Sequence, residues 1–309
     1  MVGEDGLRKT WSPRFTLRSH YDTIRAMAFH PVEPVLLTAS EDGTMKMWNL
    51  QKSAVTSPGT PGAGAKKTGN ATDLEPVYTF RGHRGAILCL CMSPTGDCCY
   101  TGGLDGTVRC WSLPSPNIDM YDTYDGKILS ETLIGHSNAV WSVAFHTSDN
   151  RLISASADGS LKLWEPGNPT PLLRTFGAPS AGKIPTSVDF LSSDPQQIVV
   201  AYAEPTSAHV LDLETGKTVL TFHYGSETAK KATIYRIASH PTMPITVTAN
   251  SDHMIRYFDN NTGSVMHEVV THQDAVSCVS IDPNGLYLLS GCRDGSLRLW
   301  NLDTKTCLQ

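Results

Sequence analysis

The sequence lacks the features that would indicate a nucleic-acid-binding, membrane-spanning or secreted protein. Its 25 Lys and Arg are scattered, not gathered into runs that could neutralise a phosphate backbone, and the formal net charge is −5. No stretch approaches eighteen consecutive apolar residues, and the first ten residues are polar, without an apolar signal core. We therefore expect no nucleic-acid partner, no transmembrane segment and a cytoplasmic location.

The cysteines lack the spacing of a zinc site. None of the eight forms a CxxC pair, and most lie inside strand-like apolar runs such as 88–92 and 98–100. This distribution predicts buried free thiols in a reducing compartment, and neither a metal nor a cofactor is expected.

A repeated pattern is what the sequence does contain. Four segments superimpose without gaps, each with a His, a Ser or Thr 18 residues later, an Asp 22 residues later and a Trp 28 residues later. These four quartets are His20, Thr38, Asp42 and Trp48; His83, Thr101, Asp105 and Trp111; His136, Ser154, Asp158 and Trp164; and His272, Ser290, Asp294 and Trp300. Repetition at this spacing predicts a fold built from similar units.

Two further copies are degenerate. The fifth keeps Asp252 and has Phe258 at the Trp position, but Lys230 stands where the His should be. A weaker copy before it has Leu211 at the Trp position and Pro205 near the Asp position. The chain therefore contains six units.

Each unit has the pattern of short strands separated by turns. In the first unit these strands are 24–29, 35–40 and 44–48, and a fourth, 77–80, leads into the next Gly-His. Asp-Gly at 42–43, 105–106, 158–159 and 294–295 supplies a tight turn, since Gly tolerates positive φ. Four antiparallel strands per unit predict radially stacked blades, that is, an all-β propeller.

The predicted organisation is a lead-in at 1–13 and a propeller at 14–309. Its units lie near 14–50, 77–113, 129–165, 172–213, 218–260 and 265–302. Residues 51–76, rich in small and polar residues, should form a flexible insertion loop, in which Ser57 and Thr60, each followed by Pro, are candidate phosphorylation sites. A second insertion, 114–127, is either a partner-binding hairpin or an ordinary long loop at the opposite face.

Hydrogen bonding explains why these four residue types recur together. If the four side chains of a quartet converge, a buried carboxylate gains a hydrogen-bond donor at each step, and bonds to a charged group contribute about 1.5–3 kcal/mol each. A Ser/His/Asp hydrolase triad is the functional alternative, but a catalytic triad occurs once per active site, whereas this set recurs with a Trp. Phosphate-binding loops, nucleophile elbows and HExxH motifs are also missing, so we expect no enzyme.

On these residues the chain resembles the WD40 repeats and, more narrowly, the striatins. The stretches that carry the resemblance are 7–11 (LRKTW), 30–40 (HPVEPVLLTAS), 184–190 (IPTSVDF) and 296–307 (SLRLWNLDTKTC). One departure is that Asn49, Ser112, Glu165 and Asn301, and no Asp, follow the four tryptophans. The fold should be unaffected, because the stabilising Asp is the one in the preceding turn.

The resemblance implies a seven-bladed architecture of which this chain shows six blades. Either the last repeat is missing, as in a fragment or isoform with an unfinished seam, or residues 14–18 close a six-bladed ring. It also implies a non-catalytic scaffold, a regulatory subunit of protein phosphatase 2A in a phosphatase–kinase (STRIPAK) complex with germinal-centre kinases, a Mob-like protein and cortactin-binding proteins. Calmodulin, caveolin and membranes would be engaged through the full-length protein.

A docking surface is expected where the His loops and Asp-Gly turns emerge together. One ring of positions beside them holds Arg25, Leu88, Trp141, Tyr235 and Ser277, and a second holds Glu41, Leu104, Ala157, Ser251 and Arg293. Arg and aromatic residues are common interface anchors, so Arg25, Trp141, Tyr235 and Arg293, with Glu41, are the partner-binding candidates. Alternatively, Trp141 and Tyr235 pack between blades.

Two other binding functions stay open. A substrate receptor of a cullin-4-type ubiquitin ligase usually carries Arg three residues after the repeat Trp, where this chain has Gln51, Pro114, Gly167 and Asp303. A histone-tail reader would be supported by an acidic central channel.

Overall fold

The computed structural model describes residues 13–51, 72–118, 125–146, 149–177, 182–203, 206–224 and 232–309. The candidate phosphorylation sites Ser57 and Thr60 lie outside these ranges. Within them every regular element is a strand, and no helix is long and apolar enough to cross a membrane.

The strands of the first three units are β1 (Phe15–Leu17), β2 (Ile24–Phe29), β3 (Val35–Ser40), β4 (Thr44–Asn49), β5 (Thr72–Leu74), β6 (Tyr78–Arg81), β7 (Ile87–Met92), β8 (Cys98–Gly103), β9 (Val108–Ser112), β10 (Leu129–Leu133), β11 (Val140–Phe145), β12 (Leu152–Ser156), β13 (Leu161–Trp164) and β14 (Leu172–Phe176). Those of the last three are β15 (Pro185–Phe190), β16 (Gln197–Tyr202), β17 (Ser207–Asp212), β18 (Thr218–Thr221), β19 (Ile234–Ser239), β20 (Ile245–Asn250), β21 (Met254–Asp259), β22 (Val265–Val270), β23 (Val276–Ile281), β24 (Tyr287–Cys292), β25 (Leu297–Asn301) and β26 (Thr306–Cys307).

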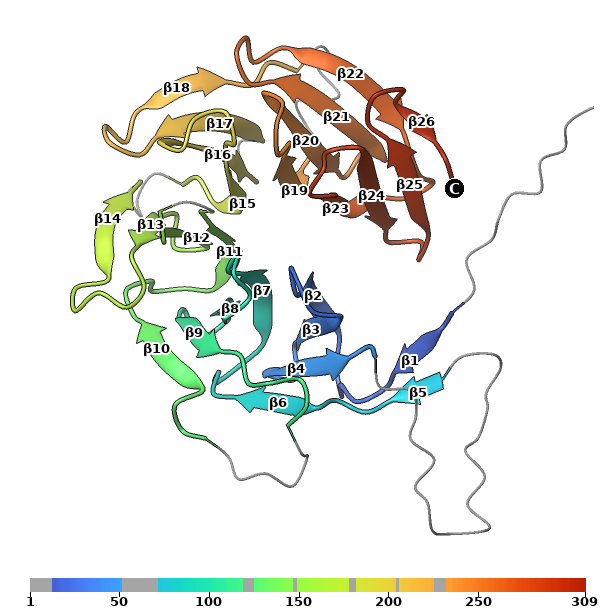
Figure 1. Ribbon diagram of the computed structural model, residues 1–309. Helices are drawn as coiled ribbons and strands as arrows, with labels where there is room; N and C mark the ends of the chain where they lie inside the picture. Colours follow the sequence, from blue (N-terminus) through green and yellow to red (C-terminus); the bar gives the residue numbers. More distant parts are fainter. Residues whose placement is uncertain are drawn as a thin grey trace, which may run out of the picture.

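Six antiparallel sheets of four strands each are arranged as the blades of a propeller (Figure 1). In each sheet the strands follow chain order from the centre outward, with β2, β7, β11, β15, β19 and β23 innermost. This arrangement confirms the all-β propeller predicted from the repeats. The Asp-Gly turns have the predicted backbone as well, because Gly43, Gly106, Gly159 and Gly295 have φ between 72° and 83°.

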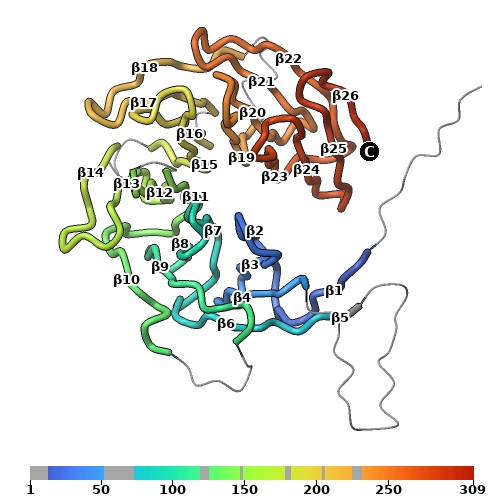
Figure 2. Tube along the Cα trace, viewed as in Figure 1, coloured from blue at the N-terminus to red at the C-terminus, as the bar shows by residue number. Residues whose placement is uncertain are grey.

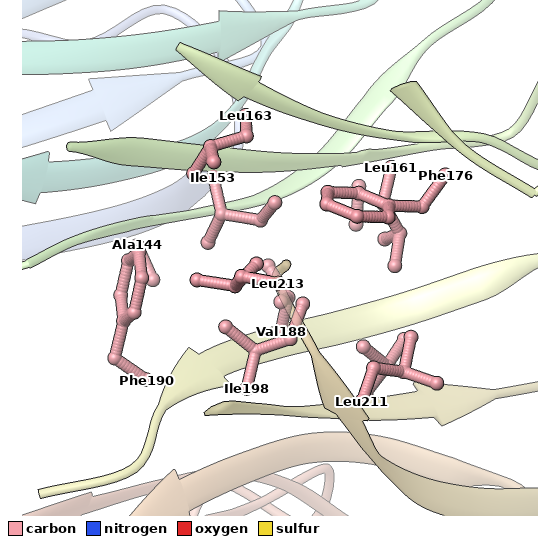
Figure 3. Packing of buried hydrophobic residues seen from close by; sticks show 12 residues of the cluster. Ala144, Ile153, Leu161, Leu163, Phe176, Val188, Phe190, Ile198, Leu211 and Leu213 are labelled. Atoms are coloured by element: carbon pink, nitrogen blue, oxygen red, sulfur yellow. The ribbon is translucent and has the colours of Figure 1, made fainter. Parts of the chain in front are cut away.

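Apolar side chains of neighbouring blades form the core. One cluster lies between the third and fourth blades: Ile153 and Leu163 of one sheet face Val188, Ile198 and Leu213 of the other (Figure 3). Similar clusters join the first blade to the second and the fifth to the sixth. Because the strands bury apolar residues on both faces, each blade is stabilised by its neighbours more than by its own turns.

The amino-terminal strand does not close the ring. β1 pairs in parallel with β5, and Phe15 and Leu17 pack against the outer part of the first blade, on Leu36, Trp48 and Leu74. Of the two alternatives, the one in which residues 14–18 close a six-bladed ring therefore does not hold. Figures 1 and 2 show the sixth blade standing apart from the first, while every other pair of consecutive blades is adjacent.

The two blade faces at this seam are exposed. On β2, Met27 is 62% exposed, whereas Leu90, at the same position in the second blade, is 5% exposed. On the sixth blade Leu297 is 57% exposed, whereas its counterpart Val108 is fully buried. Apolar side chains that elsewhere hold two blades together thus lie uncovered on both sides of the seam.

This difference predicts opposite outcomes for the same substitution at two equivalent positions. Met27→Lys should change the unfolding free energy by less than about 1 kcal/mol, because its ammonium group stays in water. Leu90→Lys should cost several times more, because it places an ammonium group between two blades. Urea denaturation of the two variants measures both values. Comparable losses of stability would show that the seam is covered in solution.

Candidate functional site

The first three blades bring all four members of the quartet together. In the third blade Trp164 Nε1 lies 2.8 Å from Ser154 Oγ, which lies 2.7 Å from His136 Nε2, and His136 Nδ1 lies 3.0 Å from the Asp158 carboxylate. The first and second blades repeat these contacts at 2.8 to 3.1 Å, through Thr38 and Thr101. We call such a set a clasp.

A clasp ties the loop before the inner strand to the turn between the second and third strands. Asp158, in that turn, also accepts the amide N–H of Ser137 at 3.0 Å and both the amide and the hydroxyl of Ser160, at 2.8 and 2.6 Å. The indole donates to the hydroxyl, the hydroxyl to His136 Nε2, and Nδ1–H to the carboxylate. The carboxylate, 6% exposed, therefore has a donor for each available lone pair.

These bonds explain the acidity of the clasp carboxylates. Burial would raise the pKa of Asp158, but the hydrogen bonds from Ser160, Ser137 and His136 outweigh it and lower the pKa to about 2. The pKa of Asp42 is lowered to about 2 for the same reasons, through Thr44, His20 and Tyr21. Burial lowers the pKa of His136 despite the neighbouring Asp158, so its ring is neutral at pH 7.

The clasp has the connectivity of a Ser/His/Asp hydrolase triad but not the accessibility. Ser154 and Ser290 are fully buried, and each hydroxyl accepts an indole N–H. A nucleophile must reach a substrate carbonyl, which these oxygens cannot do without unfolding the blade.

The sixth blade departs from the predicted quartet. Trp300 and His272 both contact Ser290 Oγ, at 2.9 and 2.8 Å, as in the other clasps. His272 Nδ1, however, lies 2.8 Å from Ser296 Oγ instead of contacting Asp294, whose carboxylate accepts the Ser296 amide at 2.7 Å. The sixth blade therefore keeps the Trp, Ser and His contacts of the quartet, and the Ser296 hydroxyl takes the place of the carboxylate at His272 Nδ1.

The fifth blade uses an ion pair instead of a clasp. Arg256, whose side chain is 1% exposed, binds Asp252 through its guanidinium and Glu268 Oε1 through Nε at 3.0 Å. Phe258 occupies the Trp position and stacks on Phe222, with ring centroids 4.7 Å apart. Lys230 and Pro205 lie outside the described residues.

The first docking ring coincides with a feature that sequence reasoning missed. Every inner strand has a β-bulge near its start, and the bulged residues are Arg25, Leu88, Trp141, Thr186, Tyr235 and Ser277. A bulged residue is not paired with the next strand, so its side chain does not have to follow the alternation of side chains between the two faces of the sheet. No residue type marks this bulge in the sequence; only the pairing of two strands reveals it.

The second docking ring lies beside the first in the five blades that contribute to it. The backbone amide of Glu41 donates to the carbonyl of Thr23, and that of Arg293 donates to the carbonyl of Ala275. Each acceptor lies two residues before the bulged residue of its strand. In the first blade Arg25 Nε contacts Glu41 Oε1 at 2.6 Å. Between the fifth and sixth blades, the guanidinium of Arg293 lies 5.0 Å from the ring centroid of Tyr235.

Trp141 is the most exposed aromatic candidate of the two rings. It is 40% exposed, which argues against the alternative that it simply packs between blades. Together with Leu104, which is 55% exposed, it provides apolar surface on the same face as Arg25 and Arg293. We call this face, formed by the two rings, the loop face.

A polar cavity of about 360 Å³ lies among the inner strands of the second to sixth blades. Asp189, Arg236 and Asp282 are part of its lining. Asp189 accepts the amide of Ser239 from the next blade at 2.8 Å, and burial raises its pKa. Sequence reasoning missed this carboxylate, because Asp189 stands at an ordinary strand position.

The clasp assignment predicts a pH-dependent effect of Asp158→Asn. An amide cannot accept from all four donors, so the variant should lose about 2–3 kcal/mol of unfolding free energy at pH 7. The wild-type carboxylate has a lower pKa folded than unfolded, so its stabilisation is present above about pH 4 and is lost as the pH falls toward 2. Denaturant titrations between pH 7 and 3 should therefore show a shallower fall for the variant.

The matched control is Asp303→Asn, which removes an exposed carboxylate from the sixth blade. It should leave both the stability and its pH dependence unchanged. Equal stability of Asp158→Asn and the wild type at pH 7 would contradict the clasp assignment.

The family model for the WD domain, G-beta repeat, matches residues 11–49, 74–112, 127–165 and 263–301. These are the units with the complete predicted quartet. The chain is also 49% identical over 308 residues to striatin of Mus musculus and 48% identical over 310 residues to striatin-3 of Rattus norvegicus, which covers 99% and 100% of this chain and 38% of either relative. Striatin-4 of Mus musculus is 47% identical over 99% of this chain and 39% of its own length.

The chain thus spans about two fifths of the length of these curated relatives. Its similarity to them extends through the units that the repeat model does not match, including the degenerate fourth and fifth blades. The chain therefore belongs to the WD40-repeat family, as a WD40 domain of the striatin type.

Proposed function

We propose that this chain is the non-catalytic docking module of a striatin-type scaffold, and that the loop face binds its partner proteins. The observation that supports this most is the coincidence of the two rings: in five of the six blades the bulged residue lies close to a turn residue that is exposed or half-buried. Arg, Trp and Tyr at these positions have the composition of interface anchors.

The rest of the scaffold role rests on the resemblance to striatins. The full protein would be a regulatory subunit of protein phosphatase 2A that assembles a STRIPAK complex in the cytoplasm, with germinal-centre kinases, a Mob-like protein and cortactin-binding proteins. Calmodulin and caveolin would bind elsewhere in the full-length protein, as would membranes. The contribution of this chain would be to hold a partner at the loop face.

The buried clasps support a module without catalysis, since their hydroxyls cannot reach a substrate. The histone-tail alternative gains little from the central cavity, because Arg236 shares the lining with Asp189 and Asp282. The ubiquitin-ligase alternative lacks the Arg expected after the repeat Trp.

Charge reversal on the loop face tests the proposal. Arg25→Glu combined with Arg293→Glu should weaken binding of purified partners by about tenfold or more, since it removes two anchors and repels acidic groups. Stability should change little, because an exposed ion pair and an exposed cation–π contact contribute about 1 kcal/mol or less each. Calorimetric titration against a germinal-centre kinase, a Mob-like protein and the phosphatase core measures the affinities.

The control is Arg151→Glu combined with Lys217→Glu, which makes the same change of charge in loops at the other end of the strands. It should leave the affinities unchanged. A loss confined to this control would move the docking site to the opposite face, and no binding by the wild-type chain would reject the docking role.

A further inference from the structure

In the sixth blade the clasp lacks the direct contact between His and Asp, and a cysteine occupies a position that holds serine in other blades. Cys292 stands where the first and third blades have Ser40 and Ser156. In those blades the serine hydroxyl accepts the amide of the turn Asp, at 3.2 and 3.1 Å. Cys292 is 9% exposed and lies beside the carboxylate of Asp294.

Three donor atoms of different chemistry converge at this point. Nδ1 or Nε2 of His272, Sγ of Cys292 and a carboxylate oxygen of Asp294 all lie within 4.8 Å of one another, and it is the one such group of His, Cys and acidic residues among the described parts of the chain. Nitrogen, thiolate and carboxylate are the donors that zinc takes in proteins. The spacing of these residues does not predict a metal site, because His272 is 20 residues from Cys292 and the sequence has no CxxC pair.

We propose that His272, Cys292 and Asp294 form a binding site for Zn²⁺ or a similar transition-metal ion on the loop face of the sixth blade. With bond lengths of about 2.0–2.3 Å, the donors of a tetrahedral zinc site lie roughly 3.3–3.8 Å apart. The donors must therefore approach by about 1 Å. The exposed side chain of Asp294 can contribute to this movement, and the Ser296 hydroxyl, 2.8 Å from His272 Nδ1, would give up that contact to the metal.

The hydrogen bonds of His272 suit a metal ligand. A metal on Nδ1 requires the proton on Nε2, from where it can be donated to Ser290 Oγ at 2.8 Å. The Ser290 hydroxyl can in turn donate to the backbone carbonyl of Arg298, 3.4 Å away. A ligand histidine that donates its second N–H in this way is fixed in orientation.

Charge and access are also suitable. A thiolate and a carboxylate neutralise the two charges of Zn²⁺, and the exposed side of Asp294 leaves a fourth position for water. Bound metal would link the His loop to the Asp-Gly turn, the connection that the first three blades make by hydrogen bonds. Two of the ligands, Cys292 and Asp294, flank Arg293, but the proposed coordination does not require a bound partner protein.

The test uses the whole chain, purified in a chelator and then freed of it. Titration with cobalt chloride should give one equivalent of binding, with the near-ultraviolet band of a thiolate-to-cobalt charge transfer. Zinc chloride should displace the cobalt and raise the Tm. Cys292→Ser should abolish the band and weaken zinc binding about tenfold or more, measured against a chromogenic zinc chelator.

Two further variants complete the design. Cys292→Ser restores the residue of the first and third blades, so it should fold, and Cys307→Ser, which removes an exposed thiol of the same sheet, should bind like the wild type. Asp294→Asn should retain the charge-transfer band with weaker affinity. Absence of the band in the wild type, its persistence in Cys292→Ser, or equal zinc affinity of Cys292→Ser and Cys307→Ser would overturn the proposal.

Discussion

A carboxylate withdrawn from water is the constraint on which each complete blade depends. The Asp-Gly turn places an aspartate beneath the loop that enters the blade, where its charge is stabilised only if loop amide, turn amide, hydroxyl and imidazole all donate to it. The imidazole is held in turn by a buried Ser or Thr that also receives the Trp indole. The loop and the turn therefore cannot move separately, and the face that they form is rigid for the same reason that the blade is stable.

Much of this could be predicted from the sequence, because the signals are local. The strands Ile24–Phe29 and Val35–Ser40 agree with the predicted ones, since each is a short strand-like run bounded by turn residues, and the Asp-Gly turn follows the second. The contacts of the sixth clasp could not be predicted. Its quartet has the same spacing as the others, and the difference depends on the Ser296 hydroxyl and the Cys292 thiol, which no pattern of four residues includes.

The sequence shows which side chains are apolar, but it does not show which of them are buried by a neighbouring blade. Met27 and Leu90 occupy equivalent positions and have similar hydrophobicity, yet only Leu90 has a blade against it. Whether a propeller strand is buried depends on the unit next to it. The exposure of the strands at the seam between the first and sixth blades therefore could not be predicted from the residues of those strands. Arg256 was missed for a different reason: its partners Asp252 and Glu268 lie on a turn and on the outer strand of its own blade, and their approach to Arg256 depends on the pairing of these strands.

The bulges separate the proposed docking residues from the residues that maintain the fold. Clasp positions vary little among the first three blades, whereas the bulge positions hold Arg25, Leu88, Trp141, Thr186, Tyr235 and Ser277. A bulged residue stands outside the register of its strand pair, so its side chain can change without altering the hydrogen bonds on either side. Because a clasp just beside it immobilises the backbone, such a side chain would bind a partner from a fixed backbone position and would lose little backbone freedom on docking. Blades held by similar clasps can therefore carry an irregular surface for the proposed docking of partners without loss of stability.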